Sequence, residues 1–291
     1  MTYRDPRMNG RTPYRSTYPQ QRSQRPGSFL QKRMSRKEFL VTIGGLLITG
    51  VLAWLFGQHN INHSTQQKTN TPAASKSAQS TDAPTFNKSR YSQSDPASIW
   101  LVVNKQRQLN PATFVPSNLV VPNIPLRSNI TSTEKYVRAD MATALEAMAT
   151  AANTEHIHLN LQSGYRSYQF QVDLYNSYVR QEGKAQADRE SAHPGYSEHQ
   201  TGMAADLGGD TNPACNVAQC FATTSEGTWL AANAYKYGFV IRYPADKESI
   251  TGYEYEPWHV RYVGTDLATE MHNQGIETLE EFFGLGAAPS Y

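Results

Sequence analysis

Cysteine is scarce in this chain, with only Cys215 and Cys220 among its 291 residues. The two lie close together in a polar stretch without the further ligands that a cysteine-based zinc site needs, so such a site is not expected there. A disulfide formed in an oxidising compartment is the favoured prediction, and a pair of free thiols is the alternative.

Hydrophobic residues are also scarce, at 38% of the chain. The shortage falls within roughly the first hundred residues, so the remainder can still bury a normal core. The length allows one or two domains, and no internal repeat appears.

Positive charge is lacking outside the N-terminal region. The chain has 27 basic and 25 acidic residues. Residues 1–38 contain ten of the basic and two of the acidic residues, which leaves 17 basic and 23 acidic residues in the remainder. A net charge of −6 gives no basis for phosphate neutralisation, so we expect no nucleic-acid partner.

The N-terminal region divides into a basic tail and an uncharged segment. Residues 1–38 show no sustained apolar period and predict a disordered tail. Residues 39–56, FLVTIGGLLITGVLAWLF, carry no charge, and as a helix they would span about 27 Å, enough for a bilayer core. The sequence therefore predicts a transmembrane signal-anchor over residues 39–56.

A basic cluster directly before this segment sets its expected orientation. Lys32, Arg33, Arg36 and Lys37 favour a cytoplasmic N-terminus, so we expect a single-pass cell-membrane protein with its remainder outside the cell. A buried soluble helix would need an amphipathic stripe, and a cleaved signal peptide would need a small-residue cleavage site; neither is present.

The rest of the chain is expected to be a linker and a folded domain. Residues 57–96 are polar and predict a flexible linker, and the domain is expected over residues 97–285. Its expected strands are 100–104, 156–164, 239–243 and 259–264, and its expected helices are 133–152 after the capping residues Ser132 and Thr133, 167–181 closed by Gly183, 229–238, and a C-terminal tail through Phe283. Mixed strands and helices without a regular βαβ alternation indicate an α+β fold.

Two short motifs carry candidate metal ligands. In SEHQTGMAAD, His199 precedes Asp206 by seven positions, and a turn at Gly202 can bring the two side chains to one point. In EPWH, Glu256 lies three residues before His259. Two imidazoles and one carboxylate form a three-ligand zinc set that leaves a position for water, and a further carboxylate can take a proton from that water.

Each motif alone is common, but they occur together with a third, SGYRS at residues 163–167. The strings SGYRSYQFQ, PGYSEHQTGMAADL, YGFVIRYP, ITGY and EPWHVRYVG follow in this order. Over about residues 97–285 the chain resembles the VanY-type D-alanyl-D-alanine and LD-carboxypeptidases, which are zinc peptidoglycan peptidases. The resemblance implies a small antiparallel sheet flanked by helices, of the DD-peptidase and hedgehog type, with the zinc site in a cleft on the sheet.

The resemblance also implies roles for individual residues. His199, Asp206 and His259 would bind one zinc ion per chain, and Glu256 would be the general base and then the acid. Arg166 would bind either the oxyanion or the substrate carboxylate. The expected substrate-pocket residues are Ser197, Gln171, Tyr243 and Trp258.

Structural roles are the alternatives for several of these residues. Trp258 and Tyr243 can belong to the core, and Ser197 can merely turn its loop. Three other histidines compete as ligands. His156 and His158 alternate on an expected strand and are interpreted as a strand face, whereas His193 can line the site without ligating.

Three functions follow from this set. The leading hypothesis is a carboxypeptidase that removes a terminal D-alanine from peptidoglycan stem peptides. An endopeptidase with the same zinc machinery is the first alternative. A non-catalytic wall-binding module is the second, although the joint presence of the ligands with Glu256 and Arg166 argues against it.

Overall fold

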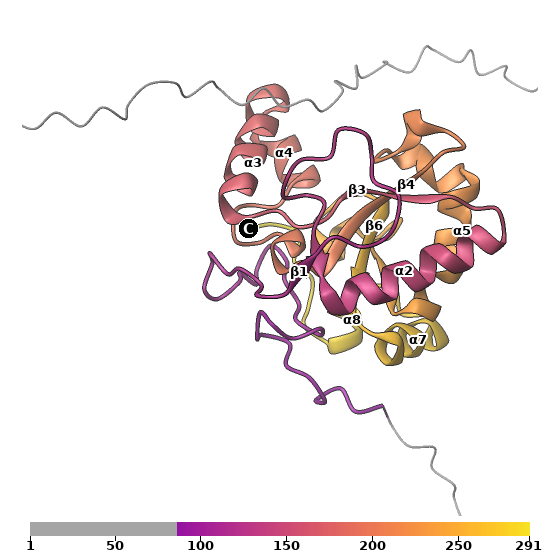
Figure 1. The fold of residues 1–291 in the computed structure, drawn as a ribbon. Helices are drawn as coiled ribbons and strands as arrows, with labels where there is room; N and C mark the ends of the chain where they lie inside the picture. The colour runs from indigo at the N-terminus through magenta and orange to yellow at the C-terminus, as the bar shows by residue number, and fades with distance from the viewer. Residues whose placement is uncertain (1–85) are drawn as a thin grey trace, which may run out of the picture. The chain divides into compact units, whose positions relative to one another are not determined.

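The computed structural model describes residues 86–291 (Figure 1). The tail predicted over residues 1–38, the membrane span predicted over 39–56 and most of the linker predicted over 57–96 lie outside these residues. Among the described helices, none combines the length and the apolar character needed to traverse a bilayer.

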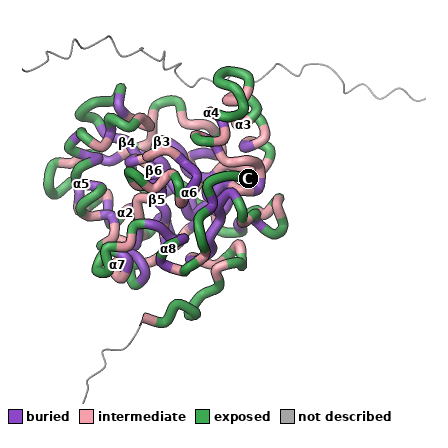
Figure 2. The backbone as a smooth tube through the Cα atoms, turned by 180° about the vertical axis from the view of Figure 1, so that it is seen from behind, coloured by how far each residue is buried: buried purple, intermediate pink, exposed green. Residues whose placement is uncertain are grey.

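A four-stranded antiparallel sheet forms the centre of the domain, in the order β3, β4, β6, β5. Its strands are β3 (Leu159–Ser163), β4 (Ala204–Gly209), β6 (Glu256–Tyr262) and β5 (Phe239–Tyr243). A separate two-stranded sheet pairs β1 (Leu119–Val120) with β2 (Val137–Arg138). Strand β4 is buried along its whole length (Figure 2), so it is the central element on which the site is built.

Helices surround the sheet, which confirms the α+β prediction. The α-helices are α2 (Ala139–Thr154), α3 (Tyr168–Glu182), α4 (Lys184–Glu190), α5 (Ser225–Asn233), α6 (Glu248–Thr251), α7 (Thr265–Gln274) and α8 (Leu279–Phe283). The short 3-10 helices are η1 (Glu198–Thr201), η2 (Pro213–Cys215), η3 (Gln219–Thr223) and η4 (Ala234–Tyr237). In both Figure 1 and Figure 2, α3 and α4 stand together, apart from α2, α5 and α7.

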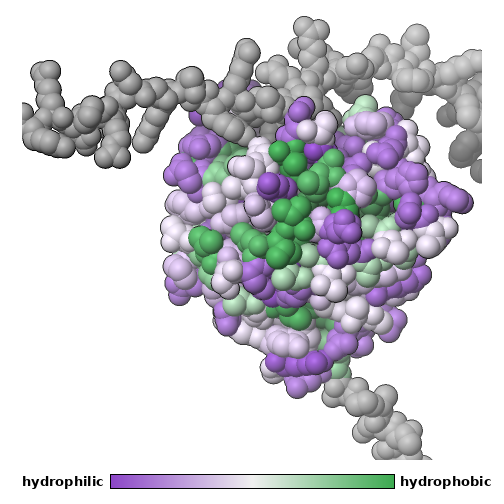
Figure 3. Space-filling view, viewed as in Figure 1, coloured by the Kyte–Doolittle hydropathy of each residue, from purple (hydrophilic) through white to green (hydrophobic). Residues whose placement is uncertain are grey.

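The main hydrophobic core lies between α2 and the sheet. Met141, Leu145 and Met148 recur at helical spacing on one face of α2 and join Leu161 and Leu207 in one buried cluster. Each such side chain stabilises the fold by about 1.5–3 kcal/mol. A second cluster gathers on α7 and α8 around Trp100. On the face drawn in Figure 3, hydrophobic residues form a band across an otherwise largely hydrophilic surface.

The helices predicted at residues 167–181 and 229–238 are present. Ser167 accepts a hydrogen bond from the backbone N–H of Phe170 at 3.1 Å and so caps α3, which ends at Gly183 with φ +84°. The second prediction corresponds to α5 followed by η4, ended by Gly238 in the left-handed conformation.

The helix predicted over residues 133–152 begins later than expected. Helix α2 starts at Ala139, because the preceding residues Val137 and Arg138 pair with β1. Its N-cap is Arg138, whose side chain makes no capping hydrogen bond, so the expected caps at Ser132 and Thr133 were wrong.

The strand predicted at residues 100–104 is also wrong. The segment is buried, but only its last residue pairs, in an isolated bridge. Its carbonyl groups instead accept hydrogen bonds from guanidinium groups: Arg107 Nε donates to Val102 at 3.1 Å, and Arg261 Nη2 donates to Leu101 at 2.9 Å. Side-chain donors thus replace a strand partner and satisfy this buried backbone.

The described chain contacts the domain before the expected boundary at residue 97. The ring of Phe86 stacks on Trp100 with centroids 5.4 Å apart, and Tyr91 meets Trp100 edge-on at 5.0 Å. Residues 86–96 therefore pack against the second hydrophobic cluster.

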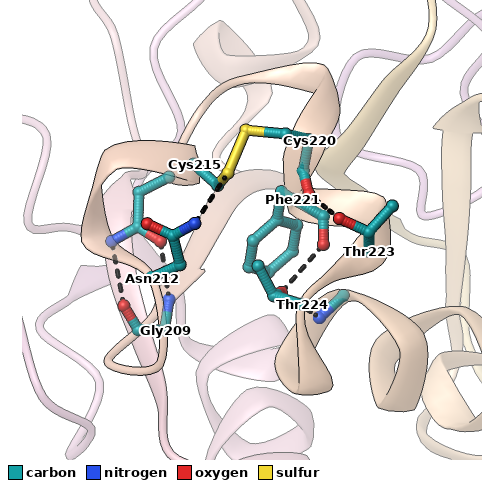
Figure 4. The surroundings of a disulfide bond; sticks show 9 residues. Gly209, Asn212, Cys215, Cys220, Phe221, Thr223 and Thr224 are labelled. Atoms are coloured by element: carbon teal, nitrogen blue, oxygen red, sulfur yellow. Dashed lines mark hydrogen bonds between the residues drawn. A yellow bond between two sulfur atoms is a disulfide. The ribbon is translucent and has the colours of Figure 1, made fainter.

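The loop between β4 and α5 contains a disulfide. Cys215 and Cys220 are joined, as the favoured prediction had it, and Asn212 Nδ2 contacts Cys215 Sγ at 3.3 Å (Figure 4). The bond closes a short loop that links η2 to η3.

Candidate metal centre

Three elements converge to bring His199, Asp206 and His259 together. His199 lies on η1, Asp206 on β4 and His259 on β6. Gly202 ends η1 with φ +69°, and this left-handed turn leads the chain directly into β4. The turn expected at Gly202 is therefore present, and the register of the sheet sets Asp206 opposite His259.

The geometry of the three side chains fits a metal ion. Asp206 Oδ1 lies 3.4 Å from His199 Nε2 and 3.3 Å from His259 Nδ1, and one ligand atom from each residue lies within 4.8 Å of the others. Asp206 Oδ1 is buried without a hydrogen-bond partner, which costs about 1–3 kcal/mol unless something binds it. Two imidazoles and a carboxylate form a set that suits zinc.

The ring of His199 is oriented by a backbone carbonyl. His199 Nδ1 donates to the carbonyl oxygen of Gly164 at 2.7 Å, which leaves Nε2 as the free lone pair. Position 164 requires glycine, because a Cβ there would lie 2.3 Å from the Tyr136 oxygen and 2.8 Å from the Glu134 oxygen. The glycine of the SGYRS motif thus permits the close approach that holds this ligand.

Arg166 lies against the second oxygen of Asp206. Its Nη2 donates to Asp206 Oδ2, and its Nε donates to Ser163 Oγ at 3.0 Å. Burial alone would raise the pKa of Asp206, but the neighbouring His199 and Arg166 lower it well below its usual value. The carboxylate is therefore held in its ionised form, the form that a metal ligand requires.

Glu256 reaches the same point through an irregularity in the sheet. Strict alternation would place residues three apart on opposite faces, but the register of β5 against β6 shifts between Ile241 and Tyr243. Glu256 Oε2 consequently lies 3.5 Å from His259 Nδ1. Burial raises the pKa of Glu256 to about 8, which brings the carboxyl group into the range that suits proton transfer near neutral pH.

The four residues expected to line the substrate pocket have different surroundings in the structure. The ring of Tyr243 lies 4.8 Å from that of His259, so it borders the site. Ser197 is buried directly before η1. Gln171 is buried, donates to Ala192 O at 2.7 Å and leaves its Oε1 without a hydrogen-bond partner. Trp258 instead packs against the main hydrophobic cluster.

The three competing histidines lie outside the ligand set. His156 and His158 precede β3 rather than lie on it, so their interpretation as one strand face was wrong. The side chain of His158 is 56% exposed. His193 Nε2 lies 2.9 Å from Asp188 Oδ1, and its ring stacks on Tyr291.

Sequence reasoning missed Glu198, which is completely buried beneath the site. Its Oε1 accepts from Arg242 Nε at 2.8 Å and from Arg261 Nη1 at 2.9 Å. Burial alone would raise the pKa of Glu198, but these two guanidinium groups lower it well below its usual value. The available signal was an arginine inside each of two expected strands, Arg242 and Arg261, because a buried charge needs a partner.

Comparisons with known proteins agree with this geometry. A family model described as VanY, D-alanyl-D-alanine carboxypeptidase, matches residues 134–265. The putative carboxypeptidase YodJ of Bacillus subtilis (strain 168) is 43% identical over 189 residues, which cover 65% of this chain and 68% of that protein.

Two solved structures share the fold and part of the sequence. The LdcB LD-carboxypeptidase has a TM-score of 0.61 and 43% identity, covering 65% of this chain and 87% of that one. A D,D-pentapeptidase VanY from a VanB-type vancomycin resistance cassette, solved in complex with Zn(II), has a TM-score of 0.51 and 30% identity, covering 64% and 98%.

Proposed function

Because this chain belongs to the VanY D-alanyl-D-alanine carboxypeptidase family, we propose that it is a zinc-dependent carboxypeptidase that removes a terminal D-alanine from peptidoglycan stem peptides. The observation that carries the proposal is the cluster of His199, Asp206 and His259 beside Glu256. The zinc complex of a structural relative supports the choice of metal.

The metal would be held by His199 Nε2, Asp206 Oδ1 and His259 Nδ1, one ion per chain. When bound, zinc supplies Lewis-acid chemistry that polarises a carbonyl group and acidifies water. The burial of the three side chains strengthens every charge interaction there.

Glu256 would transfer the proton. It takes a proton from the attacking water, whose oxygen forms the new bond to the carbonyl carbon. It then delivers that proton to the amine of the departing D-alanine as the peptide bond breaks. Burial raises the pKa of Glu256, which favours the acid form that delivers the proton to the leaving amine.

Arg166 would hold a negative oxygen of the substrate. Its guanidinium group is anchored by Asp206 and Ser163 and keeps 13% of its side chain exposed. A fixed guanidinium fork binds either the developing oxyanion or the terminal carboxylate. Tyr243, Ser197 and Gln171 would complete the substrate pocket.

The segment over residues 39–56 would anchor the enzyme in the cell membrane, with the catalytic domain outside the cell. Its uncharged composition and the preceding basic cluster support this placement. The disulfide suits an oxidising compartment, and the cell wall outside the membrane is where such stem peptides are found.

The test is a digestion of defined stem peptides by the zinc-loaded full chain, with the products identified by mass. Loss of one D-alanine from a tetrapeptide or a pentapeptide is the expected result; the two substrates distinguish an LD from a DD bond. Internal cleavage would instead identify an endopeptidase. Binding without any cleavage, with zinc present at one ion per chain, would identify a non-catalytic module.

A further inference from the structure

His259 lies among three carboxylates, two on one side of its ring and one on the other. Nδ1 lies 3.3 Å from Asp206 Oδ1 and 3.5 Å from Glu256 Oε2, whereas Nε2 lies 3.6 Å from Glu198 Oε2. Only Nδ1 faces the proposed metal position. The proposed reaction gives no role to Glu198 or to the contact behind the ring.

Glu198 is fixed in position by a buried network of charges. Arg242 and Arg261 both donate to Glu198 Oε1. Arg242 also donates to both oxygens of Glu280, at 3.0 and 2.7 Å, and Arg261 donates to the backbone of Leu101. Two cations and two carboxylates balance, and all four side chains are at most 1% exposed.

The second oxygen of Glu198 is directed at the imidazole. Among the described residues, neither Glu198 Oε2 nor His259 Nε2 has a hydrogen-bond partner, and both are buried. A carboxylate with two arginine partners can only accept, so the ring nitrogen that faces it carries a hydrogen whether or not Nδ1 carries one. Metal binding at Nδ1 then displaces only a hydrogen on that side of the ring, and Nε2 keeps its own.

We propose that Glu198 is a positioning residue that selects the Nε2–H tautomer of His259 and aims its Nδ1 lone pair at the metal. This inference rests on the proposed metal site. The two histidine ligands then use opposite nitrogens, because His199 is fixed through Nδ1 by the Gly164 carbonyl and His259 is fixed through Nε2 by a carboxylate.

The first experiment measures the tautomer directly in the full chain labelled with ¹⁵N-histidine. Long-range ¹H–¹⁵N spectra of the metal-free and the zinc-loaded protein are expected to show a hydrogen on His259 Nε2 in both. A His259 whose Nε2 carries no hydrogen in either state would overturn the proposal without any need for a variant.

The variant Glu198→Gln gives a sharper result. Arg242 and Arg261 still require an acceptor, so the amide oxygen must face them and the amide NH₂ must face His259. The ring is then expected to switch to the Nδ1–H form, which blocks the metal-binding nitrogen. The zinc dissociation constant, measured by competition with a chromophoric chelator, is expected to rise about 10- to 100-fold.

Glu280→Gln is the matched control. It removes one carboxylate from the same buried arginine network, and Glu280 shows no contact with His259. Its zinc dissociation constant and its His259 tautomer are expected to match those of the wild type. Equal weakening of zinc binding in both variants, with an unchanged tautomer, would show that Glu198 merely supports the fold.

The outcomes separate this inference from the proposed function. A wild-type chain that fails to bind zinc contradicts the metal site itself. A wild-type chain that binds zinc with His259 protonated at Nδ1 contradicts only the role of Glu198.

Discussion

At the scale of single residues, the site depends on which atom of each side chain is left without a partner. Asp206 gives one oxygen to Arg166 and keeps the other, and His199 gives one nitrogen to a carbonyl and keeps the other. In each of these side chains, one atom is fixed by a neighbouring group and the other is left to bind the metal. Substitutions of Glu256 and of His259 are expected to separate proton transfer from metal binding.

Replacing the proposed base tests the proton-transfer role. Glu256→Gln is expected to keep zinc, because it leaves all three ligands, and to reduce turnover about 10²- to 10⁴-fold, because an amide cannot accept the proton. Zinc content and kcat measure the two effects. Glu254→Gln is the control, since Glu254 is only two positions from Glu256 in the sequence but pairs with Arg189. Wild-type turnover in Glu256→Gln would show that another group is the base.

Replacing a proposed ligand tests the metal site. His259→Ala is expected to lose both zinc and activity, because two ligands hold the ion much less tightly than three. His193→Ala is the control, because His193 is bound to Asp188 and Tyr175 instead, and it should retain one zinc ion per chain. Unchanged zinc content in His259→Ala would contradict the ligand set.

The sequence predicted that His199, Asp206 and His259 come together, but it did not predict the contacts of Glu198. His199, Asp206 and His259 stand in motifs whose spacing and residue types indicate zinc chemistry. Glu198 lies inside one of those motifs, on η1, but its contacts depend on Arg242 and Arg261, which lie on β5 and β6. The two strand arginines indicate that a buried carboxylate partner is needed, but they do not identify Glu198, which lies 44 and 63 positions away along the chain.

At the scale of elements, predictions succeeded where local interactions decide the structure. Ser167 and Gly183 bound α3 through their own cap and turn. The segment 100–104 has the composition of a strand, but its carbonyl groups bind Arg107 and Arg261. Arg107 is five positions from Val102, but Arg261 is 160 positions from Leu101, so the local sequence does not show that second contact.

The α3–α4 pair is held by one carboxylate. Asp188 contacts Lys184, Tyr175 and His193 at 2.5 to 2.9 Å. Burial alone would raise its pKa, but hydrogen bonds from Lys184, Tyr175 and His193 lower it to about 2. A depressed pKa stabilises the folded state above the unfolded value of 3.8 and loses that effect as the pH falls.

The corresponding prediction concerns acid unfolding. Asp188→Asn is expected to lower the free energy of unfolding by about 1 kcal/mol above pH 4, after allowance for the partial exposure of the group. The difference should fade between about pH 4 and pH 2. Urea unfolding at a series of pH values measures it. A constant difference down to pH 2 would mean that the hydrogen-bonding shape of Asp188 matters and its charge does not.

At the scale of the whole molecule, the packing of residues 86–96 sets where the domain can be cut. A chain that begins at residue 57 is expected to be soluble and active, because it keeps Phe86 and Tyr91 on Trp100. A chain that begins at residue 97 should lose about 2 kcal/mol of stability with the burial of these rings. Thermal unfolding of the two chains measures the difference, and equal stability would show that these contacts contribute nothing.

The contacts of Phe86 and Tyr91 with Trp100 also bear on how a pulling force on the N-terminal side would enter the domain. A pull on the chain ahead of Phe86 acts first on the aromatic stack around Trp100. Only when that stack yields does the force reach the carbonyls of Leu101 and Val102, which hold Arg261 and Arg107. Tension applied from the N-terminal side would thus have to break the ring cluster before it could reach Arg261, which binds Glu198 behind the proposed metal centre.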